Sequence, residues 1–203
     1  MAEFFYPRGG WRRAASYIVH RLRRLPDPPH KIARGVAAGV FVCFMPYFGF
    51  HFVMAAVLAY FMQANMVAAI LATFFGNPLT FPIIAAVALE MGQWMLGSPN
   101  VGPLPEVFNE FGRAWAELWS NTKAIFTDEP AHWDRLSRFY WRVMWPYTVG
   151  GIIPGIFTSI AVYMITLPAV EAYQRRRVAK LKARYDKRRE LSQKAATKNV
   201  DQD

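Results

Sequence analysis

The stretch that decides the fold runs from residue 35 to residue 89 and reads GVAAGVFVCFMPYFGFHFVMAAVLAYFMQANMVAAILATFFGNPLTFPIIAAVAL. Its 55 residues contain no Asp, Glu, Lys or Arg, and neither do the 28 residues from Val143 to Val170. A helix of about 20 apolar residues is long enough to cross the hydrocarbon core of a bilayer. The sequence therefore predicts an all-α integral membrane protein.

Two interruptions divide the first of these stretches. The block from Ile32 to Met62 is broken at Pro46–His51, and the block from Met66 to Leu96 is broken at Gly76–Pro82. An unbroken helix of either length would measure roughly 46 Å, more than the hydrocarbon thickness. We therefore expect interrupted or re-entrant hydrophobic helices, followed by one later transmembrane helix.

The distribution of charge predicts the topology. Residues 1–34 hold eight Lys or Arg and residues 171–203 hold eleven, whereas residues 98–142 hold five basic and six acidic side chains. By the positive-inside rule both termini face the cytoplasm. An even number of crossings follows, so at least one block is re-entrant or the third block does not span. Which block is re-entrant stays open.

Five segments result from these patterns. They are a basic amphipathic N-terminal segment (1–31), a membrane domain with two interrupted blocks (32–97), a Trp-rich interfacial segment (98–142), a transmembrane helix (143–168), and a basic cytoplasmic helix and tail (169–203). The basic runs adjoin membrane segments, so anionic lipid explains them better than nucleic acid does. The predicted anionic-lipid contacts are Arg175, Arg176, Arg177 and Lys180, with a merely solvated helix as the alternative.

The two breaks carry the candidate binding residues, and each starts a half-helix. Phe50 or His51 opens one, and Thr80 stands where it can cap the next. A helix N-terminus attracts anions, and paired interruptions of hydrophobic segments point to a transporter site. The predicted ligands for a phosphate or lipid head are Pro46, Gly49, His51, Asn77, Pro78, Thr80 and Pro82. The alternative is that prolines kink these helices and the polar side chains only satisfy freed backbone groups.

Glu90 is the only acid between Asp27 and Glu106. It can relay protons, pair with a cation such as Arg34, or approach an interface. Cys43 is the only cysteine, which excludes a disulfide or zinc framework, and no catalytic motif is present. We expect no metal, no cofactor and no enzymatic constellation.

With these residues in view, the chain resembles the bacterial membrane family known as domain of unknown function 2062. The resemblance rests on Pro46-x-x-Gly49-x-His51, Asn65, Asn77-Pro78-x-Thr80-x-Pro82 and a later Gly92 or Gly97, and extends from Trp11 to Val170. It implies an integral membrane protein. Related domains are fused to glycosyltransferases of the polyprenyl-phosphate kind, which implies work near lipid-linked phosphates.

Two functions of different classes follow. The first is a small membrane protein that binds or translocates a phosphate-bearing lipid such as polyprenyl phosphate. The second is an accessory or scaffold subunit that contacts a membrane protein partner or a second copy through its small-residue helix and Trp-rich surface. An enzyme ranks third because no acid–base pair is present. Lipids that copurify with the protein distinguish the first from the second.

Overall fold

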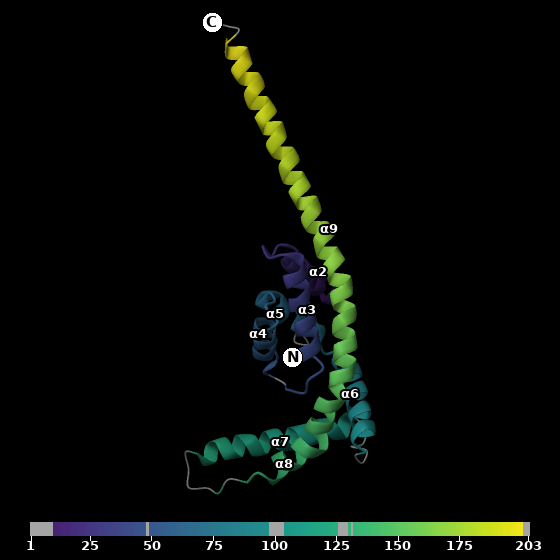
Figure 1. The fold of residues 1–203 in the computed structure, drawn as a ribbon. Helices are drawn as coiled ribbons and strands as arrows, with labels where there is room; N and C mark the ends of the chain where they lie inside the picture. The colour runs from purple at the N-terminus through teal and green to yellow at the C-terminus, as the bar shows by residue number, and fades with distance from the viewer. Residues whose placement is uncertain (1–9, 48, 98–103, 126–129, 131, 201–203) are drawn as a thin grey trace.

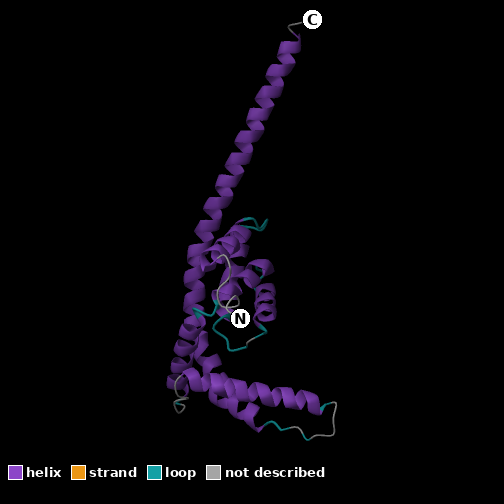
Figure 2. Ribbon diagram, turned by 180° about the vertical axis from the view of Figure 1, so that it is seen from behind, coloured by secondary structure: helices purple, strands orange, loops and turns teal. Residues whose placement is uncertain are grey.

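The computed structural model describes the chain except for residues 1–9, 48, 98–103, 126–129, 131 and 201–203. Parts of the predicted N-terminal, interfacial and tail segments therefore lie outside the described residues. Every regular element in the described ranges is helical (Figure 2). The expectation of an all-α fold is confirmed.

The first hydrophobic block forms a helical hairpin. Helix α3 (Pro29–Val42) and helix α4 (His51–Phe61) pack against each other (Figure 1). The break falls where the prolines and glycines predict it. The chain then returns to its starting level, because the backbone N–H of Asn65 donates to the carbonyl of Lys31 at 3.0 Å. Both ends of this block consequently lie at one end of the bundle.

The second block divides between two sets of neighbours. Helix α5 (Met66–Ala72), with the 3₁₀ turn η1 (Thr73–Phe75), packs against α3 and α4. Helix α6 (Phe81–Leu96) instead packs against the long C-terminal helix, at its lower end in Figure 1. The two arms thus continue in one general direction and do not fold back on each other as α3 and α4 do.

Glycines let these helices touch backbone to backbone. A Cβ atom at Gly35 would lie 2.3 Å from the carbonyl oxygen of Asn65, and one at Gly39 would lie 2.1 Å from that of Ala69. At Gly92 the added atom would lie 1.8 Å from the carbonyl oxygen of Pro146. Small residues four apart are a recognised helix-packing signal in membranes, and Gly35 and Gly39 have that spacing.

Helix α9 (Trp145–Val200) has 56 residues and a length of about 84 Å. It continues through Pro154 and Pro168, so the predicted segments 143–168 and 169–203 are joined by one helix. Among the described residues, one helical run, Asp134–Glu190, is long and apolar enough to cross a membrane. Only 11% of its most apolar stretch is buried inside the protein, so most of that surface is free to contact lipid or another protein.

A helical arm precedes α9 and lies across its lower end (Figure 1). It consists of α7 (Leu104–Ala124), α8 (Asp134–Phe139) and the π-helical turn η2 (Tyr140–Met144), which leads directly into α9. The second helical part of the arm is thus formed by α8 and η2 together. Exposed tryptophans line the arm: Trp115, Trp119, Trp133 and Trp141.

Two buried polar side chains hold the arm together. The amide of Asn121 donates to the carbonyl of His132, and its oxygen accepts from the N–H of the same residue at 3.0 Å. The carboxylate of Glu117 accepts from the N–H groups of Arg135, at 3.2 Å, and Leu136. These N–H groups open α8, so a carboxylate there both caps the helix and complements its dipole.

The N-terminal helix α2 (Gly10–Arg23) matches the predicted basic amphipathic helix. The loop after it is fixed by Asp27, whose carboxylate accepts from the side chain of Asn65. The backbone carbonyl of Asp27 accepts from the side chain of Gln174 at 3.0 Å. Because Asp27 contacts both Asn65 and α9, the starts of α3 and α5 lie level with residue 174 of α9.

Candidate functional site

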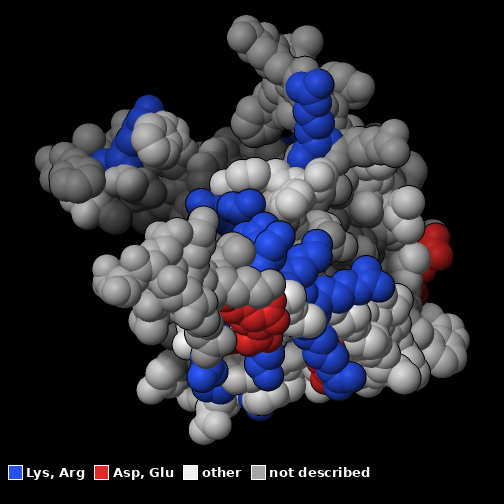
Figure 3. Space-filling model, turned by 90° about the horizontal axis from the view of Figure 1, so that it is seen from above, with Lys and Arg blue, Asp and Glu red and all other residues white. Residues whose placement is uncertain are grey.

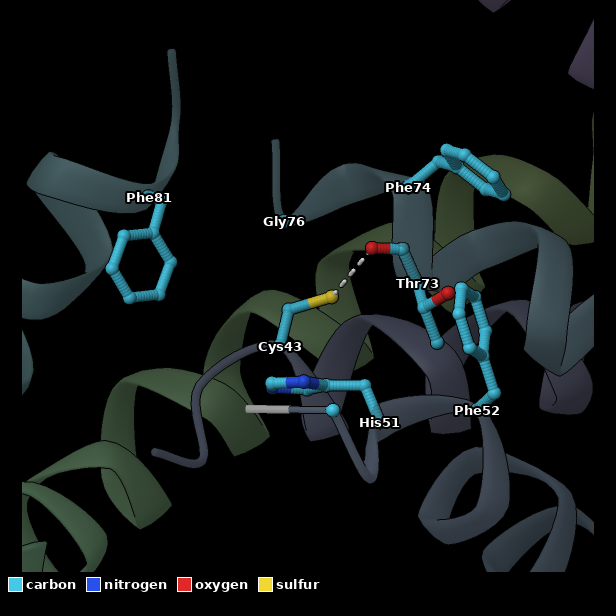
Figure 4. Close-up of a pocket in the computed structure, with 8 residues that line it drawn as sticks. Cys43, His51, Phe52, Thr73, Phe74, Gly76 and Phe81 are labelled. Carbon is cyan, nitrogen blue, oxygen red and sulfur yellow. Dashed lines mark hydrogen bonds between the residues drawn. The ribbon is translucent and has the colours of Figure 1, made fainter. Parts of the chain in front are cut away.

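The two breaks meet around one cavity of about 220 Å³ (Figure 4). Gly49 and His51 reach it from the first break, and Gly76 and Phe81 from the second. Four further residues complete the lining: Cys43, Phe52, Thr73 and Phe74. The structure therefore brings together two segments that the sequence analysis singled out separately.

His51 is the predicted ligand that lines the cavity with a polar side chain. It is the first residue of α4, and its Nε2 atom lies 3.0 Å from the carbonyl oxygen of Met45. Gly49 just before it has φ of +88°, a left-handed conformation that suits glycine. This turn aims the ring of His51 toward Cys43 in the cavity wall (Figure 4).

Asn77 and Thr80 hydrogen-bond within their own turn and are not among the residues that line the cavity. The Oδ1 atom of Asn77 accepts from the N–H groups of Leu79, at 2.9 Å, and Thr80, at 3.1 Å. The hydroxyl of Thr80 accepts from the N–H of Asn77 and donates to the carbonyl of Phe75. Thr80 does occupy the N-cap position of α6, but its side chain makes no capping bond. The expected capping bond from Thr80 is thus wrong. Its hydroxyl is used within the turn, which the side chain of Asn77 closes before α6 begins.

The three prolines among the predicted ligands shape the breaks. Pro46 is buried, whereas Pro78 and Pro82 are exposed. Pro82 stands in the first turn of α6, where a missing N–H is tolerated. None of the three is among the cavity-lining residues, so their part in ligand binding stays a prediction.

Cys43 is a cavity residue that the sequence analysis did not predict as a ligand. Its thiol lies 3.3 Å from the carbonyl oxygens of both Gly39 and Thr73, the second contact being drawn in Figure 4. Phe52 and Phe74 stack at a tilt on the same side, with ring centroids 6.3 Å apart. These residues lie within a few positions of the two breaks, and that nearness in sequence is the feature that could have predicted them as cavity residues.

Glu90 is exposed on α6, and no ion pair joins it to Arg34 in the described part of the chain. Glu90 lies beside Gly92, whose backbone contacts that of Gly150, while Arg34 shares a groove with Tyr163. Thirteen residues of α9 separate those two levels, about 20 Å. The suggested Glu90–Arg34 pair is therefore not formed, and a proton-relay role for Glu90 stays a prediction.

The basic residues of α9 lie on an exposed surface. Lys and Arg side chains gather on the face seen from the C-terminal side, with smaller acidic patches (Figure 3). Arg175, Arg176, Arg177 and Lys180 are all exposed, and Arg175 pairs with Glu171 at 3.6 Å one turn away. Among the described residues, no three His, Cys, Asp or Glu side chains are grouped to hold a metal ion.

The comparisons with known proteins agree with the resemblance. The chain belongs to a bacterial family, described as uncharacterized protein conserved in bacteria (DUF2062), whose pattern matches residues 12–179. No curated protein and no solved structure matches this chain.

Proposed function

We propose that this is a multi-pass bacterial inner-membrane protein that binds or translocates a phosphate-bearing lipid such as polyprenyl phosphate. The observation that carries the proposal is the cavity where the breaks at Pro46–His51 and Gly76–Pro82 meet. The first N–H groups of a helix lack intrahelical acceptors, and both α4 and α6 begin beside this cavity. Interrupted helices that start at a shared mid-membrane region suit an anionic group.

The arrangement of helices supports a specific topology for the proposal. The α3–α4 hairpin is the re-entrant block, because its two ends share one level and α3 measures only about 21 Å. The second block crosses once, as α5 followed by α6, and α9 crosses back. Two crossings and one re-entrant hairpin leave both termini in the cytoplasm. The exposed tryptophans of the α7–α8 arm then lie at the opposite membrane boundary.

Labelling tests this topology. A single cysteine in place of the exposed Ser120, in a Cys43→Ser background, should react with a membrane-impermeant maleimide added to intact spheroplasts. Cysteines in place of the exposed Ser16 or Arg184 should react only after the membrane is opened. Reaction of the Ser16→Cys or Arg184→Cys variant in intact spheroplasts, with or without reaction of Ser120→Cys, would contradict the topology.

Copurified lipid tests the binding. The protein should leave the membrane in mild detergent with polyprenyl phosphate or phospholipid bound, as measured by mass spectrometry of the intact complex. His51→Ala should lower retention of the lipid about 5- to 100-fold, because a hydrogen-bond partner is lost in a low-dielectric cavity. His132→Ala, an exposed histidine on the arm, is the matched control and should retain the lipid. Unchanged lipid in His51→Ala, together with a stoichiometric protein partner, would favour the scaffold function.

A further inference from the structure

A second concavity lies on α3, which stands between α4 and α9 (Figure 1). It has a volume of about 330 Å³ and shares no lining residue with the cavity at the two breaks. Its floor and walls come from Ala37 and Phe41 of α3, Leu58 of α4, and Ile156 and Ile160 of α9. These five are hydrocarbon side chains, and Ala38 and Met62 add further apolar surface, so the groove suits an apolar chain.

One cation lies in the wall of this groove. Arg34 contributes to its lining near the start of α3, at the end of the bundle where Asp27 meets α9. The guanidinium makes one long hydrogen bond, from Nη2 to the carbonyl of Gln63 at 3.4 Å. Its Nε atom is buried and has no hydrogen-bond partner. A guanidinium whose one hydrogen bond is this long is weakly satisfied, and an anion that reaches its terminal nitrogens would supply a charged acceptor.

Ser159 and Tyr163 carry the other polar groups in the groove, and both side chains are uncharged hydroxyls. The hydroxyl of Ser159 donates to the carbonyl of Gly155 in its own helix at 2.6 Å. In the described part of the chain, no carboxylate forms an ion pair with Arg34. The groove therefore combines a single cation at one end with an apolar channel along α3. From Arg34 to Phe41 the helix rises about 10 Å.

We infer that this groove is a second lipid site, in which Arg34 holds the phosphate and one hydrocarbon chain lies between α4 and α9. Free phosphate would leave the apolar walls uncovered, and a lipid without a phosphate would leave the Arg34 guanidinium with its single 3.4 Å hydrogen bond. The head lies at the basic end of the bundle, on the cytoplasmic side of the proposed topology. The inference shares with the proposed function the placement in a bilayer, but it does not depend on the cavity at His51.

Three probes separate the parts of this inference. Dioleoyl phosphatidic acid carries both the phosphate and the chains, dioleoylglycerol carries only the chains, and inorganic phosphate carries only the head. Thermal unfolding of the full chain in a neutral maltoside detergent should shift upward with phosphatidic acid and much less with the other two. Equal shifts with dioleoylglycerol would overturn the role of Arg34.

Variants then locate the effect. Arg34→Ala should weaken the binding of phosphatidic acid about 10- to 100-fold, and Arg34→Lys should weaken it less, since lysine keeps the charge but loses the forked donors. Ser159→Phe should also weaken binding, because the ring fills the groove while Arg34 remains. Arg138→Ala removes an equal charge from an exposed position of the arm and should have no effect.

The outcome also separates this site from the one at the breaks. His51→Ala should leave the phosphatidic acid response of the groove unchanged. Loss of the response in His51→Ala with its retention in Arg34→Ala and Ser159→Phe would overturn the groove and favour the cavity. Loss in the Arg34 and Ser159 variants alone supports the groove whether or not the cavity binds lipid.

Discussion

The bundle and the arm are held together by opposite means. In the bundle, α3 meets α5 and α6 meets α9 through glycines, and backbone contacts backbone. In the arm, α7 meets α8 through the buried side chains of Glu117 and Asn121, which bind main-chain groups. Close van der Waals packing works in lipid, where apolar burial supplies no force between helices. In the proposed topology, the glycine contacts lie within the bilayer and the side-chain contacts lie at its boundary.

Substitution of Gly92 should break the bundle with the largest effect. In Gly92→Ala the new Cβ would lie 1.8 Å from the carbonyl oxygen of Pro146, so α6 and α9 must separate. We expect a loss of about 3 kcal/mol in the free energy of unfolding, measured in detergent. Gly112→Ala in α7 is the control, because its Cβ would meet nothing within 4 Å and helix propensity favours alanine by about 1 kcal/mol. Equal effects at both positions would contradict the comparison.

Removal of Asn121 should open the arm and leave the bundle intact. Asn121→Ala leaves both backbone groups of His132 without their partner, at an expected cost of about 1–3 kcal/mol. Hydrogen exchange should therefore rise in α7 and α8 but not in α3 or α5. A global rise in exchange would show that the arm and the bundle unfold as one unit.

Asn77 sharpens the comparison because its side chain binds main-chain N–H groups within the bundle, as Asn121 does in the arm. Asn77→Ala removes the bonds to the N–H groups of Leu79 and Thr80, so we expect a loss of about 1 kcal/mol in the free energy of unfolding. Lipid retention per folded molecule should not change, since Asn77 is not among the cavity-lining residues. Reduced retention at unchanged stability would instead support the ligand role predicted from the sequence.

The smallest effect should come from the exposed basic residues of α9. Replacing Arg175, Arg176, Arg177 and Lys180 with Gln should leave thermal stability unchanged, because all four side chains are exposed. Protein reconstituted in nanodiscs should lose its preference for anionic over neutral lipid at low salt. The same preference in the wild type and the variant would leave α9 as a solvated helix.

The sequence was informative where physics acts locally. Uncharged runs and the positions of Pro46, Gly49 and Gly76 located the helices and both breaks to within a few residues. These features depend on nearest neighbours along the chain. The close approach of Gly35 and Gly39 to α5 was not predicted and is seen in the structure.

What depended on tertiary contacts could not be predicted. Glu117 and Asn121 resemble ordinary surface residues of an amphipathic helix until α8 folds back on them. Nothing near Arg34 in the sequence indicates that Ile156 and Ile160 complete a groove beside it. The hydroxyl of Thr80 is used within the turn before α6, where Asn77 accepts from two N–H groups, so it does not cap the helix as predicted.

The length of α9 divides its charge into two electrostatic zones. If the helix follows the membrane normal, Arg189 lies about 21 Å beyond Arg175. That separation exceeds two Debye lengths at physiological ionic strength. In the proposed topology, headgroups therefore attract Arg175 and its neighbours, whereas Arg189 and the turns around it are screened from the bilayer. The last turns then form a charged helix that projects beyond the membrane surface in this topology.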